Sequence, residues 1–320
     1  MKGEVEFMRY SEIGGMKSSK IILGTDYYGL TVSKREAFSL LDAYCAAGGN
    51  HIDTAKIYGE GHTEPLIGEW LRMHGRDGLI VATKGAHPEI GHMDVSRLSH
   101  FEIETDLDES LIRLGVDCID LYWLHRDDEA VDCGGIVETM NELVKKGKIR
   151  RFGCSNWKSR RIAEANDYAV RHGLSGFCAS QIKFSPAVTA PSYSDDPTLV
   201  EMNGDEFEFY KNAEIPVMAF APQAKGFFSK LAILGERGLS GKVRDRYLCD
   251  ENLKRFEIIK KICTRYSCSE AAAVCASLAS LAAPDTFPII GGKTVGQLTD
   301  SLSGADVVLD SMELKEIFGF

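Results

Sequence analysis

Short apolar runs rich in β-branched and aromatic residues alternate with longer helical patterns along the whole chain. Eight runs are strand candidates, and the first six are spaced by about 30 to 40 residues, as expected when one helix follows each strand. The runs are IILGT from residue 21, NHID from 50, LIVATK from 79, CIDLYWLH from 118, IRRFGCS from 149, GFCASQI from 176, PVMAFA from 216 and FPIIGG from 287.

The segments between these runs carry helix signals. SKREAFSLLDAYCAAGG begins at Ser33 with Glu36 three residues later, which predicts a capping box, and it ends on glycines. A second helix is predicted to open at Thr63 and to end at Gly75. Apolar residues at three-four spacing predict further helices within 96–115, 133–148 and 159–173. The small-residue stretch AAAVCASLASLAAP, from 271 to 284, predicts a helix packed in the core.

This alternation, with right-handed crossovers, is compatible with a closed barrel of eight strands or with a doubly wound open sheet. An open sheet that binds a dinucleotide normally carries G-x-G-x-x-G after its first strand, whereas GTDYYG follows here. No linker-like stretch divides the chain. We therefore predict one α/β domain over residues 1–320, a (β/α)8 TIM barrel. Two extended loops are expected after its sixth and seventh strands, at 186–206 and 222–246.

The formal net charge is -10, without a basic stripe, so neither nucleic acid nor a membrane is an expected partner. The Met1–Glu4 start has no apolar segment behind it, which argues against a signal peptide. The nine cysteines are scattered, without C-x-x-C spacing. We therefore expect reduced thiols in a cytoplasmic protein, with a disulfide framework as the alternative. The sequence leads to no expectation about the oligomeric state.

Polar residues stand at the expected carboxyl ends of three strands: Asp53, Lys84 and His125, with Tyr58 in the loop after the first of them. In a barrel these ends meet at one mouth. A free tyrosine has a pKa near ~10, and we expect the Lys84 ammonium, paired with Asp53, to lower it. His125 would then donate a hydrogen bond to a substrate carbonyl, and Tyr58 would be the proton donor.

Each of these residues also has an ordinary interpretation. Asp53 alone would be a cap, Tyr58 a surface residue, Lys84 a solvated charge and His125 a buried histidine bonded to the backbone. A glycosidase-like carboxylate pair after His125 would leave Tyr58 and Lys84 without a role. The joint placement at barrel strand ends favours the catalytic interpretation.

HIDTAKIYG, VATKG and DLYWLHRDD, in this order and spacing, resemble the aldo-keto reductase family. The resemblance continues through RRFGCSNW from 150, ASQIKFS from 179, PVMAFAPQAKGFF from 216 and IIGGKTVGQLTDSL from 289. It implies an oxidoreductase that reduces an aldehyde or ketone to an alcohol with NADPH or NADH. Asp53, Tyr58, Lys84 and His125 would be its catalytic tetrad, with Tyr58 as the general acid.

The resemblance also implies a set of nucleotide contacts on the loops at the mouth. They are Gly24 and Thr25 at the nicotinamide half, Ser155, Asn156 and Gln181 at the carboxamide, Phe220 stacked on the ring, Ala221, Gln223 and Lys225 along the pyrophosphate, Gly292, Lys293 and Thr294 at the ribose phosphate, and Gln297, Asp300 and Ser301 near the adenine. Many relatives carry tyrosine where Phe220 stands, and Glu-Asn where Asp300-Ser301 stands.

The GGKT turn after the last strand ends like a P-loop, but Phe287 occupies the position of that motif's first glycine. A glycine turn, a lysine, a threonine and a helix start still make an anion site. This site favours NADPH, with NADH possible, although Gln297 replaces the arginine of some relatives.

The substrate is expected to be a small carbonyl compound, with Tyr28, His87 and Trp157 lining its pocket. For Tyr28 and Trp157, packing in the core or at the rim is the alternative. The acidic, hydroxyl-rich segment 192–206 suggests a sugar-like substrate. No metal site is predicted, because the histidines after Lys84 lack further ligands at usable spacing. Two alternatives stay open: a nicotinamide-nucleotide-sensing regulatory subunit with slow turnover, and an unrelated barrel hydrolase.

Overall fold

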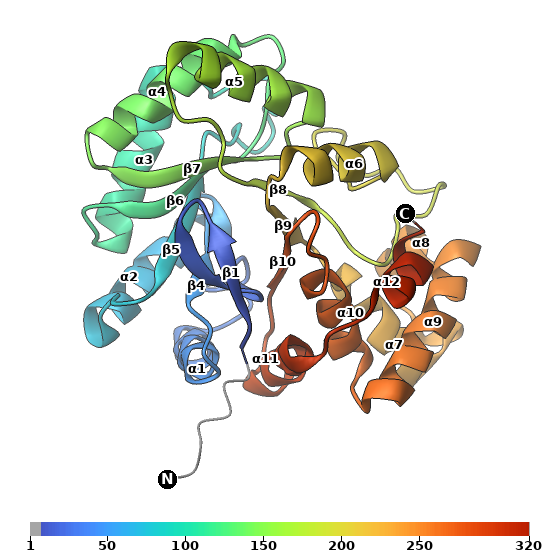
Figure 1. Ribbon diagram of the computed structural model, residues 1–320. Coiled ribbons are helices and arrows are strands. Elements are labelled where there is room, and N and C mark those ends of the chain that lie inside the picture. Colours follow the sequence, from blue (N-terminus) through green and yellow to red (C-terminus); the bar gives the residue numbers. More distant parts are fainter. Residues whose placement is uncertain (1–7, 320) are drawn as a thin grey trace.

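Eight parallel strands close into a barrel in the computed structural model, which describes residues 8–319 (Figure 1). The predicted barrel is confirmed, and each of the eight predicted runs overlaps one barrel strand, with ends that agree within one residue for the three strands that extend beyond their runs. The strands are β3 Ile22–Gly24, β4 His51–Asp53, β5 Ile80–Gly85, β6 Ile119–Leu124, β7 Ile149–Ser155, β8 Ser180–Lys183, β9 Val217–Phe220 and β10 Thr286–Ile290. The chain start, from which the absence of a signal peptide was predicted, lies outside the described residues.

A ring of helices surrounds the strands (Figure 1). The predicted capping box is confirmed, since the Ser33 side chain accepts from the Glu36 N–H and the Ser33 N–H donates to the Glu36 carboxylate. The helices of this ring are α1 Lys34–Ala46, α2 Thr63–His74, α3 His100–Leu114, α4 Cys133–Lys145, α5 Ser159–His172, α6 Gly204–Ala213, α10 Glu270–Ala279, α11 Val295–Leu302 and α12 Ser311–Phe318. In α10 every residue from Ala272 to Ala279 is buried, as the small-residue pattern predicts.

An antiparallel hairpin, β1 Tyr10–Ile13 and β2 Met16–Ser19, closes the end of the barrel at which the strands begin. The sequence analysis did not predict it. Its Ile13 is fully buried and packs on barrel-interior residues such as Ile22 and Leu121. The hairpin therefore forms the floor of the barrel, and the end at which the strands finish is not covered by it.

The core has two parts, one inside the barrel and one between the strands and the helices. Inside the barrel the largest side chain is Trp123, which is fully buried. A Cβ on Gly153 of the neighbouring strand would lie 2.4 Å from the Trp123 ring. The absence of a side chain at Gly153 thus leaves the space that the Trp123 ring occupies inside the barrel.

The two segments predicted as extended loops differ in the structure. The first is irregular from the end of β8 to the start of α6, as expected. The second is not a loop, because Phe227, Phe228 and Leu231 bury one face of a helix. It contains the 3-10 turns η2 Ala224–Gly226 and η3 Glu236–Gly238 and the helices α7 Phe227–Leu234 and α8 Gly241–Tyr247, and α9 Asp250–Tyr266 follows it.

Within residues 8–319, none of the helices has the length and apolar character that crossing a bilayer requires. The nine cysteines, which all lie in this range, are free thiols.

A buried carboxylate on α3 joins the loops that follow β4 and β5. Asp106 accepts from the Lys56 ammonium, from the Arg97 guanidinium at 2.6 Å and from the Ala86 N–H at 2.9 Å, and only 2% of its side chain is exposed. Lys56 precedes Tyr58 in one loop, and Ala86 follows Lys84 in the other. Asp106 therefore fixes two of the segments that position the site.

We expect Asp106→Ala to lower the free energy of unfolding by about 3 kcal/mol, since it leaves two cations and a buried N–H without their acceptor. Urea unfolding followed by circular dichroism measures the loss. The control is Asp108→Ala on the same helix, whose side chain is 47% exposed and which should cost less than about 1 kcal/mol. Equal losses in the two variants would contradict a special role for Asp106.

Candidate active site

The mouth of the barrel is organised around one buried ammonium group. Lys84, near the end of β5, donates to Asp53 Oδ2 at 2.6 Å, to the Thr54 carbonyl at 2.8 Å and to the Tyr58 hydroxyl at 3.0 Å. Its side chain has no exposed surface. An ammonium has three N–H donors, so this network uses all of them. The structure thus brings three of the four predicted catalytic residues into direct contact.

Asp53, the last residue of β4, is held from two other strands. Gln181 of β8 donates its amide N–H to Asp53 Oδ1 at 3.0 Å. The hydroxyl of Thr25, just after β3, donates to the Asp53 carbonyl at 3.0 Å. Both carboxylate oxygens of Asp53 are therefore occupied, and the pair with Lys84 has one defined geometry.

Tyr58 begins the 3-10 turn η1, Tyr58–Gly61. At the next position, Gly59 adopts a φ of 57°, and a Cβ there would lie 2.4 Å from the Tyr28 carbonyl oxygen. This turn therefore requires glycine. It sets the Tyr58 ring with its centroid 4.5 Å from the Lys84 ammonium.

Burial raises the pKa of Tyr58 above its usual value, although the Lys84 ammonium opposes this effect. The expected net lowering of this pKa is therefore wrong for this structure, because the desolvation of a phenolate outweighs one neighbouring cation. For Lys84, burial disfavours the charge, but Asp53 and Tyr58 together raise its pKa. At neutral pH the site holds a phenol beside an ammonium.

His125 follows β6 directly, and its ring lies edge-on to Tyr58 with the centroids 6.0 Å apart. Burial, with the charges of Lys84 and Arg126, holds the pKa of His125 well below its usual value, so the imidazole is neutral. Its Nδ1 atom is buried and has no hydrogen-bond partner among residues 8–319. The backbone bond that a purely structural histidine would make is not formed at this atom.

Of the residues predicted to line the substrate pocket, His87 joins this group, with its ring centroid 4.7 Å from that of His125. Trp157 does not, because it is fully buried and packs on Phe177 on the helix side of β7. Tyr28 is also buried in the outer core. The two aromatic residues are thus core residues rather than exposed pocket walls.

The residues predicted at the nicotinamide half lie on the same rim. Asn156 has a φ of 59°, and its side-chain amide donates to the Ser155 hydroxyl at 3.1 Å and accepts from the Val200 N–H at Oδ1 at 3.2 Å. Phe220 ends β9 and is partly exposed. Gly24 ends β3. A Cβ at this position would lie 2.9 Å from the Ile289 side chain, so a glycine fits here without displacing Ile289.

The residues predicted at the adenosine half lie on α11, just before it and in the turn after β9. Thr294 caps this helix, and the Lys293 N–H donates to the Gln297 side chain at 2.9 Å. Gln223, from the turn after β9, donates to the Ser301 hydroxyl at 2.8 Å. The other predicted residues of this half lie on the same elements: Ala221 and Lys225 in the turn after β9, Gly292 before the helix, and Asp300 exposed on it.

These residues fit a phosphorylated nucleotide. Among the described residues, Lys293 forms no salt bridge, and its ammonium lies 5.9 Å from the Tyr27 ring centroid beside the start of α11. A cation and a helix N-terminus at one turn favour a phosphate group. Within the same part of the chain, no three His, Cys, Asp or Glu side chains are grouped so that they could hold a metal ion.

Three residues at the mouth were not singled out from the sequence, although each stands next to one that was. The Thr54 carbonyl binds Lys84. Arg126 donates to Thr198 Oγ1 at 3.1 Å and so ties the long loop after β8 to the end of β6. Asp26 lies beside Gly291, and burial raises the pKa of its carboxyl to about 6. In the sequence, the one sign that these three residues belong to the site is that each is adjacent to a predicted site residue.

Known proteins resemble this chain over most of its length. The family model described as "Aldo/keto reductase family" matches residues 20–319. The uncharacterized oxidoreductase YrpG of Bacillus subtilis (strain 168) is 29% identical over 96% of this chain and 94% of its own. Norsolorinic acid reductase stcV of Emericella nidulans is 29% identical over 96% and 79%. A thermostable aldo-keto reductase, Tm1743, solved in complex with the inhibitor epalrestat, shares the fold with a TM-score of 0.71 at 24% identity, covering 98% and 99%.

Because the pKa of His125 lies well below its usual value, we expect its imidazole to stay neutral at pH values at which an ordinary histidine, with a pKa near ~6.5, is mostly charged. Because the unfolded chain takes up this proton and the folded chain does not, His125 should reduce the stability progressively as the pH falls below about 6.5. NMR titration of ring-labelled protein measures the folded state, with the urea-unfolded chain as the control. Titration of His125 near ~6.5 in the folded protein would contradict the neutral imidazole.

Proposed function

The chain belongs to the aldo/keto reductase family, and we propose that it reduces an aldehyde or ketone to an alcohol with NADPH, using Tyr58 as the general acid. One observation carries the proposal. The Tyr58 hydroxyl accepts a hydrogen bond from the Lys84 ammonium at 3.0 Å. Its own proton is therefore directed away from Lys84 and is available to a substrate oxygen.

The raised pKa of Tyr58 supports the direction of this reaction. Burial keeps Tyr58 a phenol at neutral pH, which is the form that donates a proton to an oxygen gaining negative charge. After the transfer, the Lys84 ammonium faces the new phenolate and stabilises it. Asp53 holds Lys84 in place through the 2.6 Å contact.

His125 would orient the substrate carbonyl. A neutral imidazole donates one hydrogen bond, and burial beside Lys84 and Arg126 keeps this ring neutral. The carbonyl oxygen would thus lie between the Tyr58 hydroxyl and the His125 ring, which are edge-on neighbours. His87, against the other side of His125, would contact the rest of the substrate.

When bound, the reduced nicotinamide supplies the hydride that adds to the carbonyl carbon. Ser155, Asn156 and Phe220 would hold the nicotinamide half, and Gln223, Lys293 and Thr294 the phosphates. The exposed Lys293 ammonium favours NADPH over NADH, because a 2′-phosphate adds charge where this cation lies. The free thiols favour a reducing compartment such as the cytoplasm.

Tyr58→Phe tests the general acid. We expect the rate of NADPH oxidation with a reactive aromatic aldehyde to fall by about a thousandfold, since no other donor replaces the hydroxyl. The affinity for NADPH, measured by quenching of tryptophan fluorescence, should change by less than about threefold. Tyr168→Phe, the same change on the outer helix α5, should leave both quantities unaltered. Retention of most activity in Tyr58→Phe would exclude this mechanism.

Lys293→Ala tests the nucleotide preference. We expect the dissociation constant of NADPH to rise about tenfold, because one charge-assisted contact to the phosphate is lost. The dissociation constant of NADH, which lacks the 2′-phosphate, should rise less than about twofold. Lys211→Ala on α6 is the matched control. An equal effect on the two nucleotides would place the 2′-phosphate elsewhere.

A further inference from the structure

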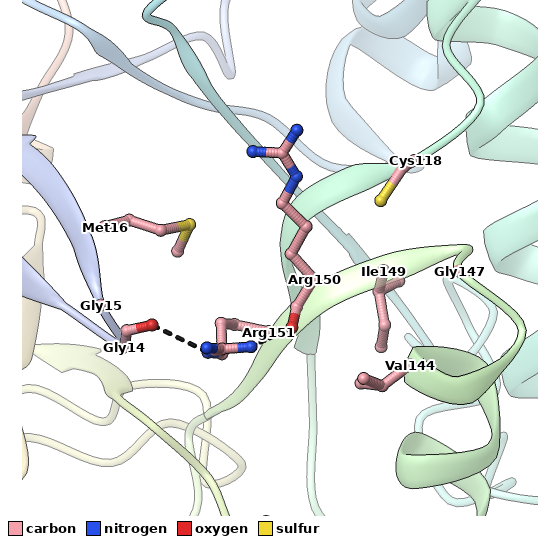
Figure 2. A pocket seen from close by; sticks show the side chains of 9 residues that line it. All are labelled: Gly14, Gly15, Met16, Cys118, Val144, Gly147, Ile149, Arg150 and Arg151. Carbon is pink, nitrogen blue, oxygen red and sulfur yellow. Dashed lines mark hydrogen bonds between the residues drawn. The ribbon is translucent and has the colours of Figure 1, made fainter.

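A second hollow lies at the opposite end of the barrel from Lys84. It has a volume of about 390 Å³ and is bounded by the hairpin turn of Gly14, Gly15 and Met16 and by the turn between α4 and β7 (Figure 2). Cys118, just before β6, and Arg150 and Arg151, near the start of β7, complete its wall. All of these residues stand at strand beginnings or on the floor hairpin. A molecule bound here would leave the mouth open.

The hollow carries more positive than negative charge. Its lining holds two guanidinium groups, those of Arg150 and Arg151, and no carboxylate. Arg150 pairs with Asp120 Oδ1 at 3.3 Å. Asp120 is shared, because its Oδ2 binds Arg76 at 2.5 Å and accepts from the Val81 N–H at 2.9 Å.

Arg151 has no carboxylate partner at all among the described residues. It donates to the Gly14 carbonyl at 2.8 Å and to the Arg150 carbonyl at 2.9 Å (Figure 2). These contacts fix the guanidinium against the hairpin but leave its charge uncompensated. The Arg150 side chain extends along the hollow and is 63% exposed. Arg151 without a carboxylate, and Arg150 with a shared one, both offer planar donors to a bound carboxylate.

The rest of the wall is apolar. Met16, Val144 and Ile149 present aliphatic or thioether groups. Small-molecule sites of a few hundred cubic ångströms usually combine such walls with a few polar groups. The chain as a whole has a net charge of -10, whereas the lining of the hollow has two arginines and no carboxylate and therefore favours an anion.

We propose that this hollow is a second binding site, for a small molecule that combines one carboxylate with a compact aromatic or aliphatic body. The carboxylate pairs with Arg150 and Arg151, and the body lies against Met16, Val144 and Ile149. The site is independent of the reaction proposed for the mouth.

The first test is isothermal titration calorimetry of the full chain with naphthalene-2-carboxylate. We expect a single site in the wild type and about tenfold weaker binding in Arg150→Ala, the loss of one charge-assisted contact. Arg150 is largely exposed, so this variant should remain folded, which thermal unfolding verifies. Arg35→Ala, an equal change of charge on α1, should bind as the wild type does. Naphthalene-2-methanol, the neutral analogue, should bind far more weakly.

The second test locates the ligand. Cys118 lies in the wall, so bound naphthalene-2-carboxylate should slow its alkylation by N-ethylmaleimide, whereas Cys249 should react at an unchanged rate. Mass spectrometry of the two peptides measures both rates. His125→Gln should not alter binding, because the mouth is not involved. Unchanged alkylation of Cys118, unchanged affinity in Arg150→Ala, or loss of binding in His125→Gln would each overturn the proposal.

Discussion

A charged amine enclosed by protein is the constraint on which the rest of the mouth depends. Removing an ammonium from water costs several kcal/mol unless strong partners replace the water. Lys84 recovers this cost through Asp53, Thr54 and Tyr58, and Gln181 and Thr25 in turn fix Asp53. These contacts join β3, β4, β5 and β8 at one end. The closed barrel is what allows four strands to meet around one charge, because their carboxyl ends share a single rim.

The same enclosure decides the protonation state of Tyr58. From the sequence, the adjacent lysine predicts a lowered pKa, since a cation favours a phenolate. The structure reverses the sign, because the site that buries Lys84 also buries the phenol. Asp53, which compensates the lysine, further weakens the pull of the ammonium on Tyr58. In the reaction that we propose, Lys84 therefore does not generate a phenolate in advance but stabilises the phenolate that forms after proton transfer.

The barrel, the ends of its strands and the contact of Asp53, Lys84 and Tyr58 could be predicted because each follows from local periodicity and one topological rule. Helix α7 could not be predicted in this way, because the glycines on both sides of FFSKLAIL are typical of a loop. The helix is stabilised by tertiary packing, since Phe227 and Phe228 are buried in the core. For Trp157 the sequence left a pocket wall and core packing open, because a large aromatic side chain suits both places. The structure buries Trp157 against Phe177.

A second buried lysine at the mouth has partners that differ from those of Lys84. Lys183, at the end of β8, binds Thr189, Asp195 and Glu201 of the long loop, and 2% of its side chain is exposed. Two carboxylates compensate the charge of Lys183. Lys183 therefore holds the loop in place, and its ammonium is not free to stabilise another anion. Lys84 has one carboxylate, one carbonyl and one hydroxyl, and the hydroxyl is the partner that can lose a proton. Within this barrel mouth, the partners of Lys183 suit an anchor for the loop, and those of Lys84 suit the proton transfer that we propose.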